Sequence, residues 1–325
     1  MLRTPSGHAA TVDCMTDISH RRHFLKATLG TAAAATLSQF VPLTALARDS
    51  KTELTTTRLN DKLVVISGAG ANVVAMKSPE GALLVDGGTQ ARSGELIKLA
   101  LKETGAKKVH TLINTHWHPE QTGSNERLGK DGARIVSHVN TKLWLGYAND
   151  VPWQDKKWGP LSPRGLPGDT TYGDKAIEFG GEHIDYLYLL QAHTDGDLAV
   201  HFKESNVIAA GGAVSSDGWP VIDYKTGGWI GGLVDGLRDL IRVCDANTKV
   251  VPANGPVIGK ADLEAQMKMY QTISQRMNQL LRKGMGPEEV LAAAPTKEFD
   301  AKWGEPTKFL TLAFKSLWGH MAPDA

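Results

Sequence analysis

The stretch that decides the fold reads Thr115-His116-Trp117-His118-Pro119-Glu120-Gln121-Thr122-Gly123. It follows an apolar run from Val109 to Ile113, which predicts a buried strand, and it leads into a Gly-Ser-Asn sequence typical of a loop. In an extended segment, residues i and i+2 point to the same side. His116 and His118 are therefore expected to direct their imidazoles at one point. Two converging histidines provide half of a metal site.

Short apolar runs separated by turns surround this stretch, and they predict further buried strands. The expected strands cover residues 63–66, 73–76, 82–85, 135–138, 184–189, 198–202 and 207–210, and the segment 250–256 closes the set. Helical spacing occurs near Leu96 to Ala100, at 140–145 and along 263–280, and Pro287 begins a further helix. Periodicity alone indicates a mixed α/β domain.

The N-terminal segment predicts export rather than folded structure. The sequence His20-Arg21-Arg22-His23-Phe24-Leu25-Lys26 resembles a twin-arginine signal, and an Ala/Thr-rich run follows it up to Ala47, where cleavage is expected. A membrane anchor is the alternative, but Ser38, Gln39 and Pro42 interrupt the apolar run. We therefore expect a signal peptide at 1–47, one domain at 48–325 with a helical last part at 260–325, and a periplasmic or secreted location.

Composition limits the classes of partner. Removing residues 1–47 changes the net charge from +1 to −1, which gives no argument for a nucleic-acid partner. Cys14 leaves with the signal, so Cys244 is the only thiol and no internal disulfide forms. Cys244 lies on an apolar helix face and is expected to be a core residue. The remaining partner class is a small-molecule substrate.

The histidine stretch resembles the His-x-His-x-Asp-His motif of the metallo-β-lactamase superfamily, which includes the glyoxalase II-like hydrolases. The resemblance runs from about Leu59 to about Trp318, with several loop motifs in the family's order. It implies a four-layer αββα sandwich with the site at one edge of the two sheets. It also implies a first metal position made by His116, His118 and His193. Three imidazoles and an open fourth position form a catalytic zinc site.

Asp86 follows the predicted strand at 82–85, in the sequence Val-Asp-Gly-Gly. The resemblance implies that Asp86 steadies the metal loop, and the alternative is that it only begins a turn.

The resemblance also implies a second metal position, at which this chain differs from the family in every ligand. The four differences are Glu120 for Asp, Gln121 for His, Gly212 for the bridging Asp and Asn254 for the last His. Amide oxygens are weak ligands, and the additional methylene of Glu120 displaces its carboxylate. Asp217, shortly after Gly212, is a further carboxylate that could reach back. We expect one zinc ion per chain.

Together, the predicted zinc site and its neighbouring residues predict a hydrolase. Zinc lowers the pKa of bound water, giving hydroxide that attacks an ester, thioester, lactone or amide carbonyl. Glu120 is expected to orient that water or accept its proton. Gln121 and Asn254 are expected to donate hydrogen bonds to the developing oxyanion. The family's name does not imply β-lactamase activity, because the fold hosts many hydrolyses.

Two other functions stay open. The chain could be a non-catalytic binding protein that keeps the fold, as the four second-position differences suggest. It could also be a mononuclear iron oxygenase, although such enzymes use a carboxylate ligand that Gly212 lacks.

His138 is expected to be a hydrogen-bonded structural histidine. Trp153 and Trp158 are expected either to form one wall of a substrate pocket or to cover the edge of the core.

Overall fold

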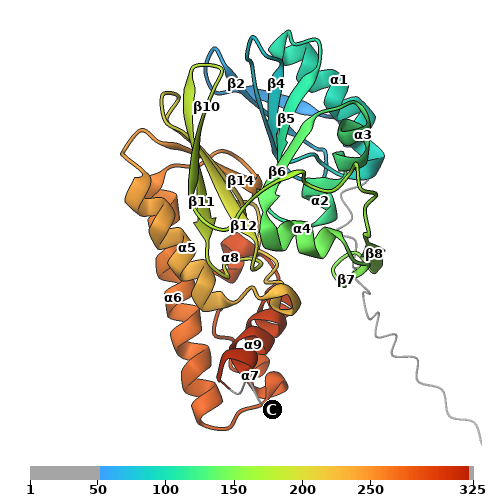
Figure 1. Ribbon diagram of the computed structural model, residues 1–325. Coiled ribbons are helices and arrows are strands. Elements are labelled where there is room, and N and C mark those ends of the chain that lie inside the picture. The colour runs from blue at the N-terminus through green and yellow to red at the C-terminus, as the bar shows by residue number, and fades with distance from the viewer. Residues whose placement is uncertain (1–51, 322–325) are drawn as a thin grey trace, which may run out of the picture. The chain divides into compact units, whose positions relative to one another are not determined.

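The computed structural model describes residues 52–321 (Figure 1). The predicted signal peptide and its cleavage after Ala47 lie outside the described residues. Within 52–321, no helix combines the length and the apolar character that crossing a membrane would require.

The first sheet has seven strands in the order β1-β2-β3-β4-β5-β6-β9. Their bounds are β1 Thr55–Arg58, β2 Leu63–Ser67, β3 Val73–Met76, β4 Ala82–Val85, β5 Val109–Ile113, β6 Arg134–His138 and β9 Asp169–Thr171. Strands β1 to β4 pair antiparallel, whereas β4, β5, β6 and β9 pair in parallel. The carboxyl ends of β4 and β5 therefore meet at the same edge of the sheet.

The second sheet has five strands in the order β10-β11-β12-β13-β14. Their bounds are β10 Lys175–Phe179, β11 Glu182–Leu189, β12 Asp197–Phe202, β13 Val207–Ser215 and β14 Lys249–Asn254. Neighbours pair antiparallel from β10 to β13, and β14 pairs in parallel with β13.

The two sheets pack face to face, and helices cover both outer faces, which gives the expected four layers (Figure 1). Strand β2 shows the reason, because its successive side chains point to opposite sides of the sheet. Leu63 and Val65 pack between the sheets, whereas Val64 and Ile66 pack against the helical layer. The prediction that strands with two apolar faces are buried is confirmed.

Two groups of helices form the outer layers. Helices α1 (Ser93–Thr104) and α3 (Asn125–Lys130) lie on the first sheet, and α5 (Ile230–Val243) and α6 (Lys260–Arg282) lie on the second. In the apolar stripe of α6, Tyr270, Ile273 and Met277 are fully buried, whereas Met267 and Leu280 are partly buried. Helices α7 (Pro287–Ala292), α8 (Asp300–Trp303) and α9 (Thr307–Met321) complete the C-terminal part, as expected. Cys244 ends α5 and is buried.

Several elements differ from the sequence-based expectation. Strand β13 does not end at Gly211 and Gly212 but continues to Ser215, with register shifts against β14 around Gly211. No element was predicted between residues 145 and 184, yet this part of the chain includes a hairpin made by β7 (Asn149–Val151) and β8 (Lys156–Trp158) as well as β9 and β10. A short helix, α2 (Pro119–Thr122), begins directly after His118, because proline suits the first helical position.

Candidate metal centre

The three histidines come from the ends of both sheets. His116 and His118 lie in the loop after β5, and His193 lies in the loop after β11. The backbone N–H of Leu198 in β12 donates to the carbonyl of Thr115 at 2.8 Å, which joins the first loop to the second sheet. The three side chains are buried, and their ligand atoms all lie within 4.8 Å of one another. The structure thus brings together the three histidines predicted from the sequence.

The outer ring nitrogen of each histidine has a hydrogen-bond partner. His193 Nδ1 lies 2.5 Å from the carbonyl oxygen of Val221, and His118 Nε2 lies 3.0 Å from Oδ2 of Asp223. His116 Nδ1 lies 3.0 Å from Oγ1 of Thr115, whose hydroxyl donates to Asp86. Because each partner accepts, each outer nitrogen carries the proton. The opposite nitrogen of each ring then carries a free lone pair. These nitrogens are Nε2 of His116, Nε2 of His193 and Nδ1 of His118.

The donor set fits a metal ion. His193 Nε2 and His118 Nδ1 are 3.1 Å apart, so two lone pairs face each other at short range. Nitrogens at about 2.0–2.1 Å from a tetrahedral zinc ion would be roughly 3.3 Å apart. Burial, followed by the neighbouring histidines, lowers the pKa of His116 and His118, and burial lowers that of His193. Neutral imidazoles with fixed outer protons are what metal binding requires.

Two buried carboxylates hold the loops that carry the histidines. Asp86 accepts from the N–H of Thr115 at 2.8 Å and from its hydroxyl at 2.9 Å. Burial raises the pKa of Asp86 to about 8, against the lowering effect of these hydrogen bonds. Asp86 has a φ of 67°, a left-handed conformation that is uncommon outside glycine, asparagine and aspartate. Asp197 accepts from the N–H groups of His193 and Thr194 at 2.5 and 2.8 Å.

Asp223 is a carboxylate that the sequence did not reveal. It follows β13 in an aperiodic loop and reaches Nε2 of His118, and it also accepts from the hydroxyl of Thr226 at 2.7 Å. The indole of Trp117 donates to the same hydroxyl at 3.2 Å. No short motif surrounds Asp223, so only the three-dimensional structure identifies it. Asp197 lies within the Ala-His-Thr-Asp-Gly-Asp sequence that contains His193. Its position close to His193 in the sequence could therefore have indicated its role.

Glu120 lies in α2, and Trp153 contacts both Glu120 and the ring of His118. Its Oε1 accepts from the indole Nε1 of Trp153 at 3.2 Å and from the amide of Gln154. Its Oε2 is buried and has no hydrogen-bond partner among the described residues. Burial raises the pKa of Glu120. Lys308, at the start of α9, is half-buried. Burial lowers the pKa of Lys308, and the nearby charge of Glu120 only partly opposes that effect.

Residues 67–252 match the metallo-beta-lactamase superfamily, which is more than half of the chain. The chain belongs to the metallo-beta-lactamase superfamily. Residues 19–38 match the signal sequence of the twin-arginine translocation pathway, which confirms the predicted export route. Comparison with curated proteins gives no match.

Solved structures of the metallo-beta-lactamase fold are similar to this one. A metallo-beta-lactamase from Pontibacter korlensis has a TM-score of 0.55 and 18% identity, over 67% of this chain and 99% of that chain. The metallo-beta-lactamase IND-7 has a TM-score of 0.55 and 17% identity, over 67% of this chain and 98% of that one. A double mutant of the sec-alkyl sulfatase PisA1 has a TM-score of 0.61 and 12% identity, over 84% of this chain and 51% of that one. At these identities the similarity shows the fold alone.

The imidazole of His193 fills the space beside Gly212, the position that corresponds to the family's bridging carboxylate. A Cβ atom at Gly212 would lie 2.2 Å from Cδ2 and 2.6 Å from Nε2 of His193. Gln121 is buried in α2, and Asn254 is half-buried at the end of β14. Among residues 52–321, only the three histidines described above form a group of three histidine, cysteine or carboxylate side chains close enough to hold a metal ion. Asp217 belongs to no such group.

The remaining side chains singled out from the sequence have structural contacts. His138 caps α4 (Val139–Leu145) by accepting from the N–H of Asn140 at 3.2 Å, and it stacks on Tyr188. Trp153 and Trp158 pack with Trp117 in a small apolar cluster.

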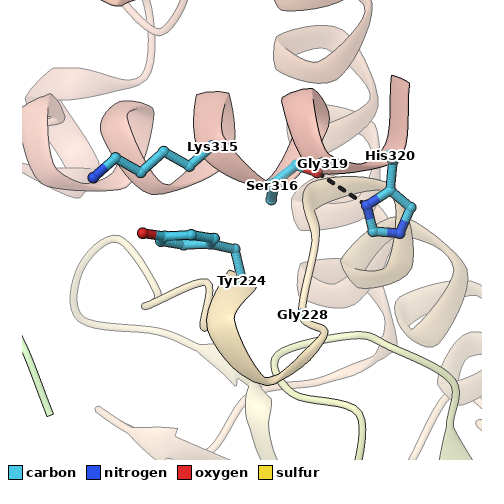
Figure 2. Close-up of a pocket in the computed structure, with 6 residues that line it drawn as sticks. All are labelled: Tyr224, Gly228, Lys315, Ser316, Gly319 and His320. Carbon is cyan, nitrogen blue, oxygen red and sulfur yellow. Dashed lines mark hydrogen bonds between the residues drawn. The ribbon is translucent and has the colours of Figure 1, made fainter. Parts of the chain in front are cut away.

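A separate pocket of about 140 Å³ lies between the C-terminal helix α9 and the turn that follows Asp223 (Figure 2). In Figure 2, Tyr224 faces Lys315, whose Nζ lies 5.6 Å from the centre of the tyrosine ring. His320 Nδ1 donates to the carbonyl of Ser316 at 3.0 Å. None of the three metal-site histidines lines this pocket, so it is distinct from the metal centre.

Proposed function

We propose that this chain is an exported, metal-dependent hydrolase that holds one zinc ion at His116, His118 and His193 and cleaves an ester, thioester, lactone or amide. The observation that carries the proposal is the arrangement of the triad, in which every outer nitrogen is engaged and the three inner lone pairs converge. Core packing does not require three buried imidazoles to face one another in this way.

A single metal position is supported by the space around His193. Its imidazole occupies the volume that a side chain at position 212 would need. The only carboxylate of the altered second position, Glu120, has one oxygen engaged by Trp153 and Gln154. Neither Gln121 nor Asn254 supplies an imidazole or a charge.

A zinc ion at this site would lower the pKa of a coordinated water and polarise a substrate carbonyl. The chain's own side chains would then accept the proton of that water and stabilise the developing negative charge. Glu120 is the group proposed to accept a proton, since its Oε2 has no hydrogen-bond partner within residues 52–321. Gln121 and Asn254 are proposed to donate to the oxygen on which negative charge develops.

The test is to replace Glu120 with Gln in zinc-loaded mature protein and to measure turnover of a p-nitrophenyl ester, a thioester, a lactone and a β-lactam. We expect loss of turnover by at least a hundredfold with zinc content unchanged, because general-base catalysis contributes about 10²–10⁴-fold. Glu264→Gln, on the exposed face of α6, is the matched control and should have wild-type activity.

Full activity of Glu120→Gln would remove this residue from the mechanism. Stoichiometric zinc binding without turnover of any of these substrates would support the non-catalytic binding protein instead.

A further inference from the structure

The β7–β8 hairpin contacts the metal loop through its two tryptophans. Its strands pair from Asn149 with Trp158 to Val151 with Lys156, which places Trp153 and Gln154 at the tip. The indole Nε1 of Trp158 donates to Oγ1 of Thr122 in α2 at 2.9 Å. Val151 is fully buried in the same small cluster as Trp117. The hairpin is therefore fixed to the loop that carries His116 and His118.

Trp153 lies directly against one of the metal-site histidines. Its ring centre is 4.3 Å from that of His118, with an angle of 52° between the planes, and 6.4 Å from that of Trp117. The Nε2 atom of His118 is held by Asp223. Rotation of the His118 ring is thus limited by an aromatic face as well as by a hydrogen bond.

The same hairpin tip controls the carboxylate of Glu120. Trp153 and Gln154 both donate to Oε1, whereas Oε2 is buried with no partner among the described residues. Two donors on one oxygen fix the plane of the carboxylate and leave the other oxygen as its only free acceptor. Buried acceptors are rarely left unpaired in folded proteins, so Oε2 is available to accept from a group of the substrate or from water.

We propose that Trp153 and Gln154 are positioning residues: the hairpin tip holds the His118 ring in its metal-binding orientation and presents Oε2 of Glu120 as the single acceptor available to the reaction. The part that concerns Glu120 rests on the proposed hydrolase function. The part that concerns His118 depends only on metal binding.

Three variants separate these roles. Trp153→Phe keeps an aromatic ring over His118 but removes the N–H donor to Glu120. Trp153→Ala removes both. Trp158→Phe is the matched control, because it removes an indole donor from the same hairpin that contacts Thr122 and not Glu120.

The first measurement is zinc affinity by competition with a chromogenic chelator, which needs no substrate. We expect Trp153→Ala to bind zinc about tenfold more weakly, since groups that support a ligand contribute about 10–100-fold to affinity. Trp153→Phe and Trp158→Phe should stay within about twofold of wild type. Wild-type affinity in Trp153→Ala would overturn the role at His118, whether or not the protein is a hydrolase.

The second measurement is kcat and KM. Trp153→Phe should lower kcat about tenfold with KM, zinc affinity and melting temperature unchanged, whereas a merely structural tryptophan would change the melting temperature and leave kcat unaffected. Unchanged kcat in Trp153→Phe would overturn the role at Glu120.

A third measurement keeps the Glu120 contact testable if no substrate is found. In ¹⁵N-tryptophan-labelled protein, Glu120→Gln should shift the indole N–H resonance of Trp153, assigned from its loss in Trp153→Phe, and leave that of Trp158 in place. An unshifted Trp153 resonance would refute the contact independently of any hydrolase activity.

Discussion

Position 212 has no room for a side chain, and this limits how many metal ligands the site can have. The atoms of the His193 ring lie 2.2–2.7 Å from where a Cβ would stand, which is closer than nonbonded atoms approach. The sequence showed that the bridging ligand of the family was missing at Gly212. It did not show that a histidine of the triad fills the space, because residues 193 and 212 meet only in the folded chain.

Gly212→Ala tests this contact. The added methyl group should displace His193, lower the free energy of unfolding by about 1–3 kcal/mol through overpacking and weaken zinc binding at least tenfold. Thermal unfolding and chelator competition measure the two effects. Gly168→Ala is the control, since no heavy atom lies within 4 Å of the position of its Cβ. Wild-type zinc affinity in Gly212→Ala would show that His193 can move without cost.

The contact between Asp223 and His118 supports a second prediction at the residue scale. Asp223→Asn replaces a charged acceptor with a neutral one, so the proton on Nε2 of His118 is held less firmly and the lone pair on Nδ1 is a weaker ligand. Zinc affinity should fall about 10–100-fold. Asp235→Asn, on the exposed side of α5, should bind zinc like the wild type. Equal affinities in the two variants would contradict the role given to Asp223.

Among the elements, those with apolar residues on both faces could be predicted from the sequence, and those held by tertiary contacts could not. Strands β2, β4 and β5 carry apolar residues on both faces and are buried between layers except for Ser67 and His110, so their patterns were sufficient. Strands β7 and β8 have three residues each, and β8 includes Lys156 and Lys157. Their hairpin depends on Trp153 and Trp158 packing against the metal loop, which no local pattern encodes.

The helical layer on the second sheet gives a prediction at the element scale. Leu237 of α5 is fully buried among side chains of the second sheet and α6. Leu237→Ala should lower the free energy of unfolding by about 2–5 kcal/mol through the cavity it leaves, with zinc stoichiometry unchanged. Leu190→Ala, at a residue that is 64% exposed, should change it by no more than about 0.5 kcal/mol. Denaturant titration with zinc analysis measures both quantities.

Across the whole molecule, the histidine triad joins the two sheets. His116 and His118 come from the end of β5 in the first sheet, and His193 comes from the end of β11 in the second. The order of the site loops and the identity of the three histidines could be predicted from the family resemblance. Asp86 could be predicted from the same resemblance, and Asp197 is only four residues from His193. Asp223 could not be predicted, because its contact with His118 joins residues 105 positions apart.

Metal analysis of the purified mature protein tests the central claim most directly. Elemental analysis after zinc-replete expression should find about one zinc per chain in the wild type and almost none in His193→Ala, because two imidazoles do not complete the site. His138→Ala, which changes a histidine outside the triad, should keep its zinc. Absence of zinc from the wild-type protein, or two zinc ions per chain, would contradict the account.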